Sequence, residues 1–337
     1  MDAFLKANGL ERLSETLEST LTLDESISLL DQGRPKLLDK LKELGVSKIP
    51  DRQAFAKAVA SGKRELAGTG APVVVFLYSA GVASSIGRKL MRKLMEACKE
   101  AGFTDQMVVD QHNFPPYDKI ASNAEYVDEI RRQVISAKAE RAGSPWIVVA
   151  HSHGAVAAYG LARLLGPQMR ALCVIGRRSP TVELLDDVFG VPTSAEVAAM
   201  PSFDIAQKLA KVYANPALLE GTSDPDSDKW DQAWVDTIQI TREQYGSPVS
   251  MCGEAEIAKY IRPTGGPIPP TARVSAPILA AFSLSETEQG ETQAKVAKWG
   301  ELTSKFDIQG FSSDHMALPG DPKVVKLVVD YIVKAVQ

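Results

Sequence analysis

A serine flanked by small residues follows an apolar run near the middle of this chain. The run Ile147-Val148-Val149-Ala150 continues as His151-Ser152-His153-Gly154. Beta-branched residues favour a strand, and small residues two positions before and after Ser152 allow the chain to turn sharply. The segment from Ala155 to Leu165 is helix-prone and stops at Gly166-Pro167. A strand, a tight turn and a helix would present the Ser152 hydroxyl as a nucleophile; the alternative is a helix N-terminal serine in another α/β protein.

A serine hydroxyl is a poor nucleophile at neutral pH and needs a histidine base that a carboxylate orients. The sequence has four histidines, which are His112, His151, His153 and His315. When the serine sits in such a turn, the histidine follows the last strand of the sheet, and only His315 is placed that way. Alternation at a tight turn points the rings of His151 and His153 away from the hydroxyl, so we interpret both as structural. We interpret His112 as a residue of the surface or of a pocket rim.

The carboxylate partner has two candidates. Glu286 and Glu288 follow the predicted strand from Pro277 to Phe282, whereas no acidic residue lies between Ala171 and Val182, after the preceding strand. The residues themselves leave Glu286 and Glu288 open, and the one that does not contact the histidine would be a solvated loop charge.

Composition excludes several classes of function. The 337 residues are 45% apolar and 24% charged, with a net charge of -4, and no basic run is interleaved with aromatics, so we expect no nucleic-acid partner. The cysteines Cys98, Cys173 and Cys252 lie far apart without a Cys-x-x-Cys pair, which argues against a disulfide framework and structural zinc. The N-terminus lacks a basic start before an apolar core, and no 18-residue apolar stretch occurs. We therefore expect a cytoplasmic protein without a signal peptide or a transmembrane segment.

The pattern of apolar residues divides the chain in two. Residues 1–65 have helical spacing throughout and predict a small all-α domain, and residues 66–71 read as a linker. From residue 72 to 337, apolar runs alternate with helices, which predicts a doubly wound, mostly parallel sheet of the α/β class. Helical and acidic segments interrupt this alternation over about residues 181–265, where we expect a lid over the site.

The N-terminal region resembles a sterile alpha motif domain. The resemblance rests on Leu37-Leu38 with Leu41, the Leu44-Gly45-Val46 turn, and Asp51-Arg52 before the last helix. It implies a helical bundle used for self-association or for docking to a partner. The alternative is an unrelated helical extension that packs on the second domain.

From about residue 72 to the end, the chain resembles the type II thioesterases that serve polyketide and nonribosomal peptide synthases. Residues 76–84 (Phe-Leu-Tyr-Ser-Ala-Gly-Val-Ala-Ser) are similar to the oxyanion loop of that family, and residues 150–155 (Ala-His-Ser-His-Gly-Ala) are similar to its Gly-His-Ser-Met-Gly-Ala turn. Gly176-Arg177-Arg178-Ser179-Pro180 resembles its Gly-Arg-Arg-Ala-Pro segment before the lid. These matches occur in the family's order.

Further matches lie toward the C-terminus. Glu254-Ala255-Glu256 with Tyr260 resembles a relaxed Arg-Ala-Asp segment, residues 285–288 with Trp299 resemble Gly-Asp-Arg-Asp and its tryptophan, and residues 315–318 resemble His-Phe-Phe-Leu. Departures include Ala150 for the first glycine of the turn, glutamate for aspartate at the acid, and Asp314 before the histidine in place of glycine. The Pro-Gly-Arg element expected after the third strand is missing.

The resemblance implies an α/β-hydrolase fold with a helical lid and a catalytic set of Ser152, Glu288 and His315. It favours Glu288 because Glu288 aligns with the second acid of the family motif, and it gives the oxyanion donors as the backbone N–H groups of Ser79 and His153. The implied reaction is hydrolysis of an acyl thioester carried by an acyl carrier protein or by coenzyme A, with no cofactor and no metal. Two alternatives remain: a lipase or carboxylesterase acting on oxygen esters, and a noncatalytic adaptor that uses the hydrolase fold for binding.

Overall fold

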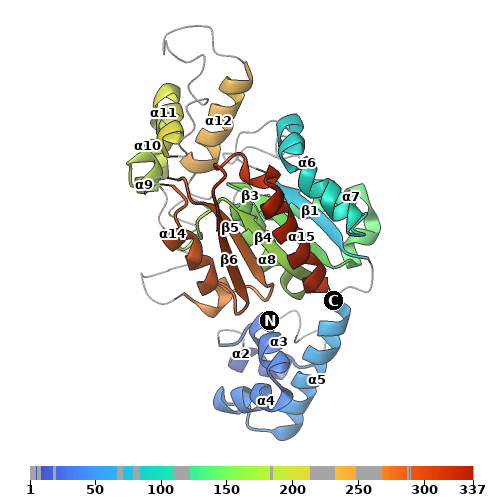
Figure 1. The fold of residues 1–337 in the computed structure, drawn as a ribbon. Coiled ribbons are helices and arrows are strands. Elements are labelled where there is room, and N and C mark those ends of the chain that lie inside the picture. The colour runs from blue at the N-terminus through green and yellow to red at the C-terminus, as the bar shows by residue number, and fades with distance from the viewer. Residues whose placement is uncertain are drawn as a thin grey trace.

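The centre of the protein is a parallel β-sheet. The computed structural model describes residues 5, 9–17, 20–66, 71–78, 84–109, 122–182, 185–212, 232–247, 268–286, 288 and 290–336. Within these residues, six strands pair in parallel in the order β2-β1-β3-β4-β5-β6 (Figure 1). The strands are β1 (Val73–Leu77), β2 (Gln106–Val108), β3 (Trp146–His151), β4 (Met169–Ile175), β5 (Ile278–Ser283) and β6 (Phe306–Phe311). The predicted parallel sheet is confirmed.

The sheet is buried because its central strands consist almost wholly of apolar residues. Every residue of β1, β3 and β5 is buried, whereas the edge strand β6 alternates between half-buried and exposed positions. A strand that is apolar on both faces has to be covered on both sides by helices. Such continuous runs could therefore be read directly from the sequence as inner strands.

Alternate residues of the strands enter two separate cores. Val74, Phe76 and Val149 pack with α6 (Ser84–Glu100) and α15 (Pro322–Val336), while Val75 and Val148 face α7 (Asn123–Ala137) and α8 (Gly154–Leu165). Short 3-10 segments complete this unit: η4 (Ala139–Gly143), η5 (Gly166–Gln168), η8 (Pro270–Ala272), η9 (Lys298–Glu301) and η10 (Leu318–Gly320), with the short helix α14 (Gln293–Ala297) before η9. The result is a three-layer arrangement of helices, sheet and helices.

The N-terminal region is helical, as predicted, and has its own core. Its elements are η1 (Glu11–Leu13), α2 (Ser14–Leu17), α3 (Leu23–Asp31), α4 (Arg34–Glu43) and α5 (Ile49–Leu66). Leu17, Leu41 and Phe55 lie in a cluster that includes no residue of the sheet unit. We call residues 5–66 the helical unit; that it is a sterile alpha motif domain stays a prediction. It meets the sheet unit mainly where α3 and α5 approach η5.

Four helices lie within the predicted lid. They are α9 (Leu185–Phe189), α10 (Ser194–Ala199), α11 (Ser202–Val212) and α12 (Gln232–Gly246), and α12 packs on α10 and α11. In Figure 1 they lie at the opposite end of the sheet from the helical unit. Residues 183–184, 213–231 and 248–265 of the predicted lid lie outside the described residues.

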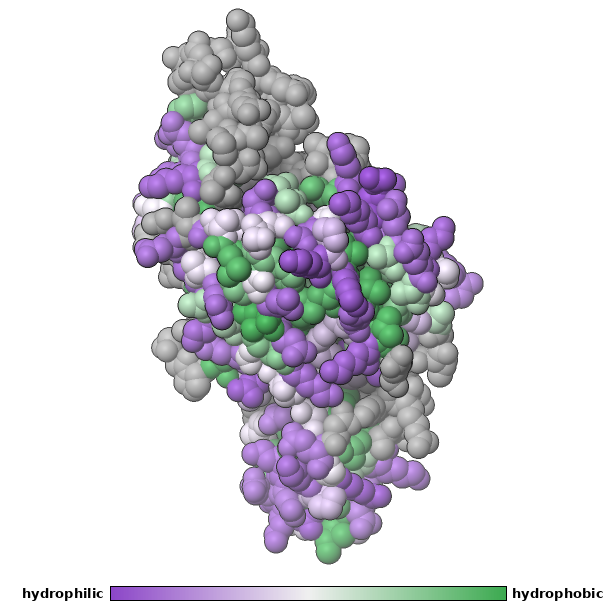
Figure 2. Space-filling model, in the orientation of Figure 1, coloured by the Kyte–Doolittle hydropathy of each residue, from purple (hydrophilic) through white to green (hydrophobic). Residues whose placement is uncertain are grey.

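In Figure 2, hydrophilic side chains predominate on the part of the helical unit that is drawn in colour, and hydrophobic side chains gather in patches over the middle of the same view. In the part of the chain that the structure describes, no helix combines the length and the hydropathy needed to cross a membrane.

Candidate active site

Ser152 occupies a strained turn between β3 and α8. Its φ is 51°, and it is the one non-glycine residue with a positive φ among the residues that the structure describes. The backbone N–H of Ser152 donates to the carbonyl oxygen of Ile175 at 2.8 Å, which ties the turn to the end of β4. A residue held in the left-handed region costs on the order of 1–3 kcal/mol, so the surrounding contacts must impose this conformation.

The small residues around Ser152 have a steric reason. A Cβ added at Gly154 would lie 2.7 Å from the backbone carbonyl oxygens of both Leu77 and Tyr78. Helix α8 therefore begins in direct contact with the end of β1, and only glycine fits there. Ala150, the small residue on the other side of Ser152, is fully buried in β3.

His315 brings an imidazole to the Ser152 hydroxyl. It follows β6, and its Nε2 lies 3.0 Å from the Oγ of Ser152. The carbonyl oxygen of His315 is 2.9 Å from Nε2 of His151, which fixes the backbone that carries the ring. Gly176, with a φ of +61°, leaves room for that ring, because a Cβ there would lie 3.2 Å from two of its atoms.

Glu286 is the carboxylate that contacts His315. Its Oε1 lies 2.9 Å from Nδ1 of His315, and both side chains are almost completely buried. A carboxylate at Nδ1 favours the tautomer in which Nδ1–H donates to Glu286, so that Nε2 can accept the Ser152 proton. We predicted this contact for Glu288, and the structure corrects that prediction: the side chain in contact is that of Glu286.

The correction has a local cause. After β5, the chain turns back so that the second carboxylate oxygen of Glu286 accepts the backbone N–H of Glu291 at 2.5 Å. A Cβ at Gly290 would lie 2.7 Å from that same oxygen, so the glycine leaves space for the carboxylate. Glu288 is exposed, and its backbone carbonyl accepts from Lys295.

A buried charge cluster holds the loop of Glu286 in place. Glu291 accepts from the backbone N–H of Arg178 at 2.6 Å and from its Nε at 3.0 Å, and Arg177 lies 3.6 Å from the other carboxylate oxygen. Burial alone would raise the pKa of Glu291, but the charges of Arg178 and Arg177 outweigh it and hold that pKa below its usual value. The cluster joins the segment after β4 to the segment after β5.

His151 and His153 are buried and uncharged. Burial lowers the pKa of each to about 3, helped by His315 in the case of His151 and by Arg177 in the case of His153. The carbonyl oxygen of His315 can only accept a hydrogen bond, so Nε2 of the neutral His151 carries the proton and donates to it. The ring that contacts the Ser152 hydroxyl is that of His315, so neither neighbouring histidine acts as its partner.

Helix α12, which lies within the predicted lid, reaches this turn through Tyr245. The Tyr245 ring contacts the ring of His153 at 5.2 Å and that of Phe189 at 5.1 Å between centroids. Its hydroxyl lies 3.1 Å from Nη1 of Arg177. Ser152 is 4% exposed and His315 is 2% exposed, so the site is almost closed in this conformation.

The other predicted site residues have different outcomes. His153 is the N-cap of α8, next to the backbone N–H groups at the beginning of that helix. Ser79 and His112 lie outside the described residues, as do Glu254, Glu256 and Tyr260. Trp299 is buried and donates from its indole nitrogen to the carbonyl of Arg177 at 2.8 Å. Among the residues that the structure describes, no group of three His, Cys, Asp or Glu residues is arranged to hold a metal ion.

Sequence reasoning missed two supporting residues. Glu291 and Tyr245 were not singled out, although both contact Arg177 and so connect the acid loop and the lid to the site. The sequence offered only an indirect sign of these two residues. Arg177 and Arg178 follow an apolar strand closely, and buried arginines require anionic or polar partners.

No protein-family model and no curated protein matches this sequence. Among solved structures, the chain is similar to RedJ with a polyethylene glycol molecule bound in its active site, with a TM-score of 0.53 at 15% identity, over 79% of this chain and 92% of RedJ. It is similar to a second structure of RedJ, the thioesterase from the prodiginine biosynthetic pathway of Streptomyces coelicolor, with a TM-score of 0.50 at 16% identity, over 79% of this chain and 86% of the other. Together with the parallel sheet and the strained serine turn, these similarities show that residues from β1 to α15 have the α/β-hydrolase fold.

Proposed function

We propose that this protein is a serine hydrolase that cleaves acyl thioesters, with Ser152 as nucleophile, His315 as general base and Glu286 as the acid that orients His315. One observation carries the proposal. A continuous line of hydrogen-bond distances, 3.0 Å and 2.9 Å, joins the Ser152 hydroxyl through the His315 ring to the Glu286 carboxylate, at a residue with a strained backbone.

The reaction follows from these contacts. Nε2 of His315 takes the proton as Ser152 Oγ attacks the acyl carbon, and the resulting imidazolium is stabilised by the negative charge of Glu286. The thiol leaves with that proton, and an ester of Ser152 remains. Water, deprotonated by the same histidine, then cleaves the ester and releases a carboxylic acid.

The oxyanion formed in each step needs N–H donors. The backbone N–H of His153 at the beginning of α8 is one proposed donor, and the N–H of Ser79 is the second. Losing one such donor costs about 10²- to 10³-fold in rate in serine hydrolases.

The choice of a thioester rests on the order of motifs in the sequence. Residues 76–84, 150–155 and 176–180 resemble successive segments of the type II thioesterases. RedJ, which shares the fold, is itself named a thioesterase of a biosynthetic pathway. We therefore propose acyl carrier protein or coenzyme A as the carrier of the acyl group, and polyketide, nonribosomal peptide or fatty acid biosynthesis as the setting.

The test combines activity with active-site labelling. In Ser152→Ala, thioester hydrolysis is expected to fall by at least about 10³-fold, and a fluorophosphonate probe should no longer label the protein. Ser136→Ala serves as the matched control, because Ser136 lies exposed on α7 and bonds only to a nearby backbone carbonyl. A Ser152→Ala protein that hydrolyses thioesters at the wild-type rate would exclude the proposed nucleophile.

Two further measurements separate the alternatives. Wild-type kcat/KM on a thioester and on the oxygen ester of the same acyl group should favour the thioester; a preference for the oxygen ester would make the protein a carboxylesterase or lipase. Stoichiometric fluorophosphonate labelling of the wild type would reject the noncatalytic adaptor, and absence of labelling would support it.

A further inference from the structure

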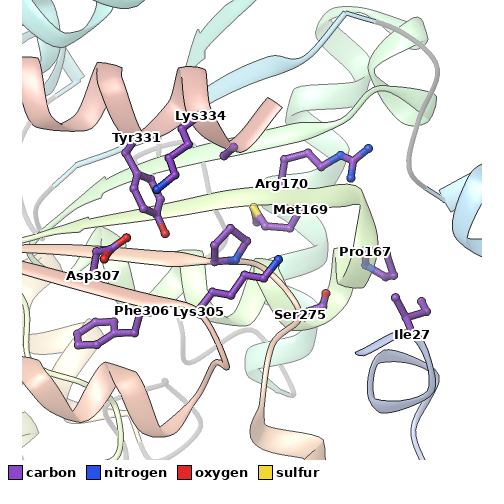
Figure 3. Close-up of a pocket in the computed structure, with 12 residues that line it drawn as sticks. Ile27, Pro167, Met169, Arg170, Ser275, Lys305, Phe306, Asp307, Tyr331 and Lys334 are labelled. Atoms are coloured by element: carbon purple, nitrogen blue, oxygen red, sulfur yellow. The ribbon is translucent and has the colours of Figure 1, made fainter. Parts of the chain in front are cut away.

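The proposed nucleophile has almost no contact with solvent. Ser152 and His315 are both buried, and Ser152 follows the carboxyl end of β3. The cavity of about 830 Å³ in Figure 3 lies at the opposite edge of the sheet, because Met169 and Phe306 in its lining begin β4 and β6. That cavity cannot hold the acyl group that Ser152 attacks. For the proposed hydrolysis, on which this inference rests, part of the protein around Ser152 therefore has to move to admit the substrate.

A buried tyrosine attaches α12 to the residues around Ser152. The Tyr245 ring contacts the His153 ring, and the Tyr245 hydroxyl accepts a hydrogen bond from Nη1 of Arg177 at 3.1 Å. The guanidinium carbon of Arg177 lies 5.7 Å from the centre of the Tyr245 ring, within the range of a cation–π contact. A hydrogen bond from a charged donor is roughly twice as strong as one between neutral groups. Movement of α12 away from Ser152 therefore has to break a strong contact with Arg177.

The same nitrogen of Arg177 has a second acceptor within reach. Nη1 lies 3.6 Å from Oε1 of Glu291, which is too long for a hydrogen bond. Among the residues that the structure describes, this oxygen has no hydrogen-bond partner, although Glu291 is fully buried and its other oxygen accepts from Arg178. A buried carboxylate oxygen without a donor costs free energy. Glu291 therefore competes with Tyr245 for Nη1.

The surroundings of Arg177 allow Nη1 to change partners. The indole nitrogen of Trp299 donates to the backbone carbonyl of Arg177 at 2.8 Å, so the backbone is held while the guanidinium can turn. A shift of roughly 0.5 Å would bring Nη1 within hydrogen-bond distance of Oε1 of Glu291. Because a buried charge that loses its partner is costly, an exchange of acceptors makes the departure of Tyr245 less costly than a simple loss of the contact.

We propose that Tyr245 and Arg177 are positioning residues that control the access of the acyl substrate to Ser152. With α12 closed, Nη1 of Arg177 donates to the Tyr245 hydroxyl; with α12 open, it donates to Oε1 of Glu291. The backbone N–H of Glu291 donates to the carboxylate of Glu286, so the loop that carries both glutamates is held more firmly when α12 opens. Glu286 thus keeps its place while the substrate enters.

Hydrogen–deuterium exchange of the full chain and of Tyr245→Phe, read by mass spectrometry, tests this change of partners without any substrate. Phenylalanine keeps the ring beside His153 and removes the hydroxyl that accepts from Arg177. Peptides from α12 are expected to exchange at least about threefold faster, because the helix opens more often. Peptides that contain the Glu291 amide are expected to exchange at least about threefold slower, because Nη1 then bonds to Oε1 of Glu291.

The opposite directions separate this role from a purely structural role of Tyr245. Loss of a hydroxyl that only supports its neighbours would speed exchange in α12 and in the loop of Glu291 alike. The inference is overturned if exchange in α12 is not faster, or if exchange in the loop of Glu291 is not slower.

Gln239→Ala is the matched control. Gln239 is exposed on α12 and bonds to Arg242 and Glu243 of the same helix. Because these contacts stay within α12, exchange in α12 and in the loop of Glu291 should remain within about twofold of wild type.

Labelling by the fluorophosphonate probe separates failure of this inference from failure of the proposed hydrolysis. Ser152 should be labelled at least about threefold faster in Tyr245→Phe than in wild type, because the open state admits the probe. Equal labelling rates in the two proteins would overturn the control of access by Tyr245. A wild type that is not labelled at all would instead exclude hydrolysis at Ser152, and the deuterium measurement would still decide whether Arg177 changes partners.

Discussion

Three side chains from three separate loops meet at the proposed site, and each fixes the next. The Glu286 carboxylate contacts Nδ1 of His315, and Nε2 of the same ring faces the Ser152 hydroxyl. The ring of His151 donates a hydrogen bond to the backbone carbonyl of His315. Glu286 is in turn held by the backbone of Glu291. The geometry therefore depends on contacts that are not themselves part of the proposed chemistry.

The two glutamates should differ sharply in a thioester assay. Glu286→Gln removes the negative charge that stabilises the His315 imidazolium, so kcat should fall by about 10²- to 10⁴-fold. Glu288→Gln, an exposed change two residues away, should leave kcat within about twofold of wild type. A larger loss of kcat in Glu288→Gln than in Glu286→Gln would identify Glu288 as the acid. The loop after β5 would then have to rearrange.

The neutral histidines make stability depend on pH. The folded-state pKa of His151 is about 3 against 6.5 when unfolded, so below pH 6.5 the unfolded chain binds a proton that the folded protein does not. The free energy of unfolding should fall with falling pH, from about 6.5 toward 3, by up to about 1.4 kcal/mol per pH unit for this group.

Urea denaturation at pH 7, 6 and 5 measures this dependence. His151→Gln keeps a donor for the His315 carbonyl and removes the titrating ring, so its unfolding free energy should fall less steeply between pH 7 and 5 than that of wild type. His153 is retained in both proteins and contributes equally to each. Identical slopes would show that His151 is not held neutral.

At the scale of elements, the close approach of α8 to β1 determines where Ser152 stands. Gly154 permits that approach, since a Cβ would meet two backbone carbonyl oxygens that cannot move away independently of the sheet. The same contact makes the turn rigid and keeps the hydroxyl at the carboxyl edge of the sheet.

Gly154→Ala should therefore destabilise the fold by about 1–3 kcal/mol, as overpacking a tight contact does. Gly143→Ala is the control, because a Cβ at Gly143 meets nothing within 4 Å. Thermal unfolding followed by circular dichroism distinguishes them: a Tm for Gly154→Ala equal to that of Gly143→Ala would mean that α8 can shift without cost.

Local patterns were sufficient to predict most elements but not the acid. The helix-prone segment from Ala155 to Leu165 and the strand from Pro277 to Phe282 match α8 and β5 to within one residue at each end, because apolar runs and helix-forming residues are local signals. Glu286 and Glu288 sit in a loop, where no periodicity tells which side chain turns inward. The choice depends on Glu291 and Gly290, which act through the folded backbone.

At the scale of the whole molecule, the two cores make the helical unit separable from the sheet unit. The helical unit buries its own leucines, and the described contacts between the units are few. We expect the first unit to mediate self-association or docking, while the second carries the proposed hydrolysis.

A chain that begins at residue 68 should therefore fold and hydrolyse thioesters at a rate close to that of the full chain. It should lose self-association in size-exclusion chromatography, since the helical unit carries the proposed docking role. Unchanged oligomeric state would count against the docking role, and failure to fold would show that the two cores depend on each other.

The positive φ of Ser152 has a consequence for how the sequence can change over evolution. Glycine would adopt that backbone conformation without strain, so a chain with no use for the hydroxyl would gain stability by a single substitution at this position. The strained backbone places the hydroxyl in line with His315 and Glu286, as a reacting serine requires, and a noncatalytic adaptor would have no use for that alignment.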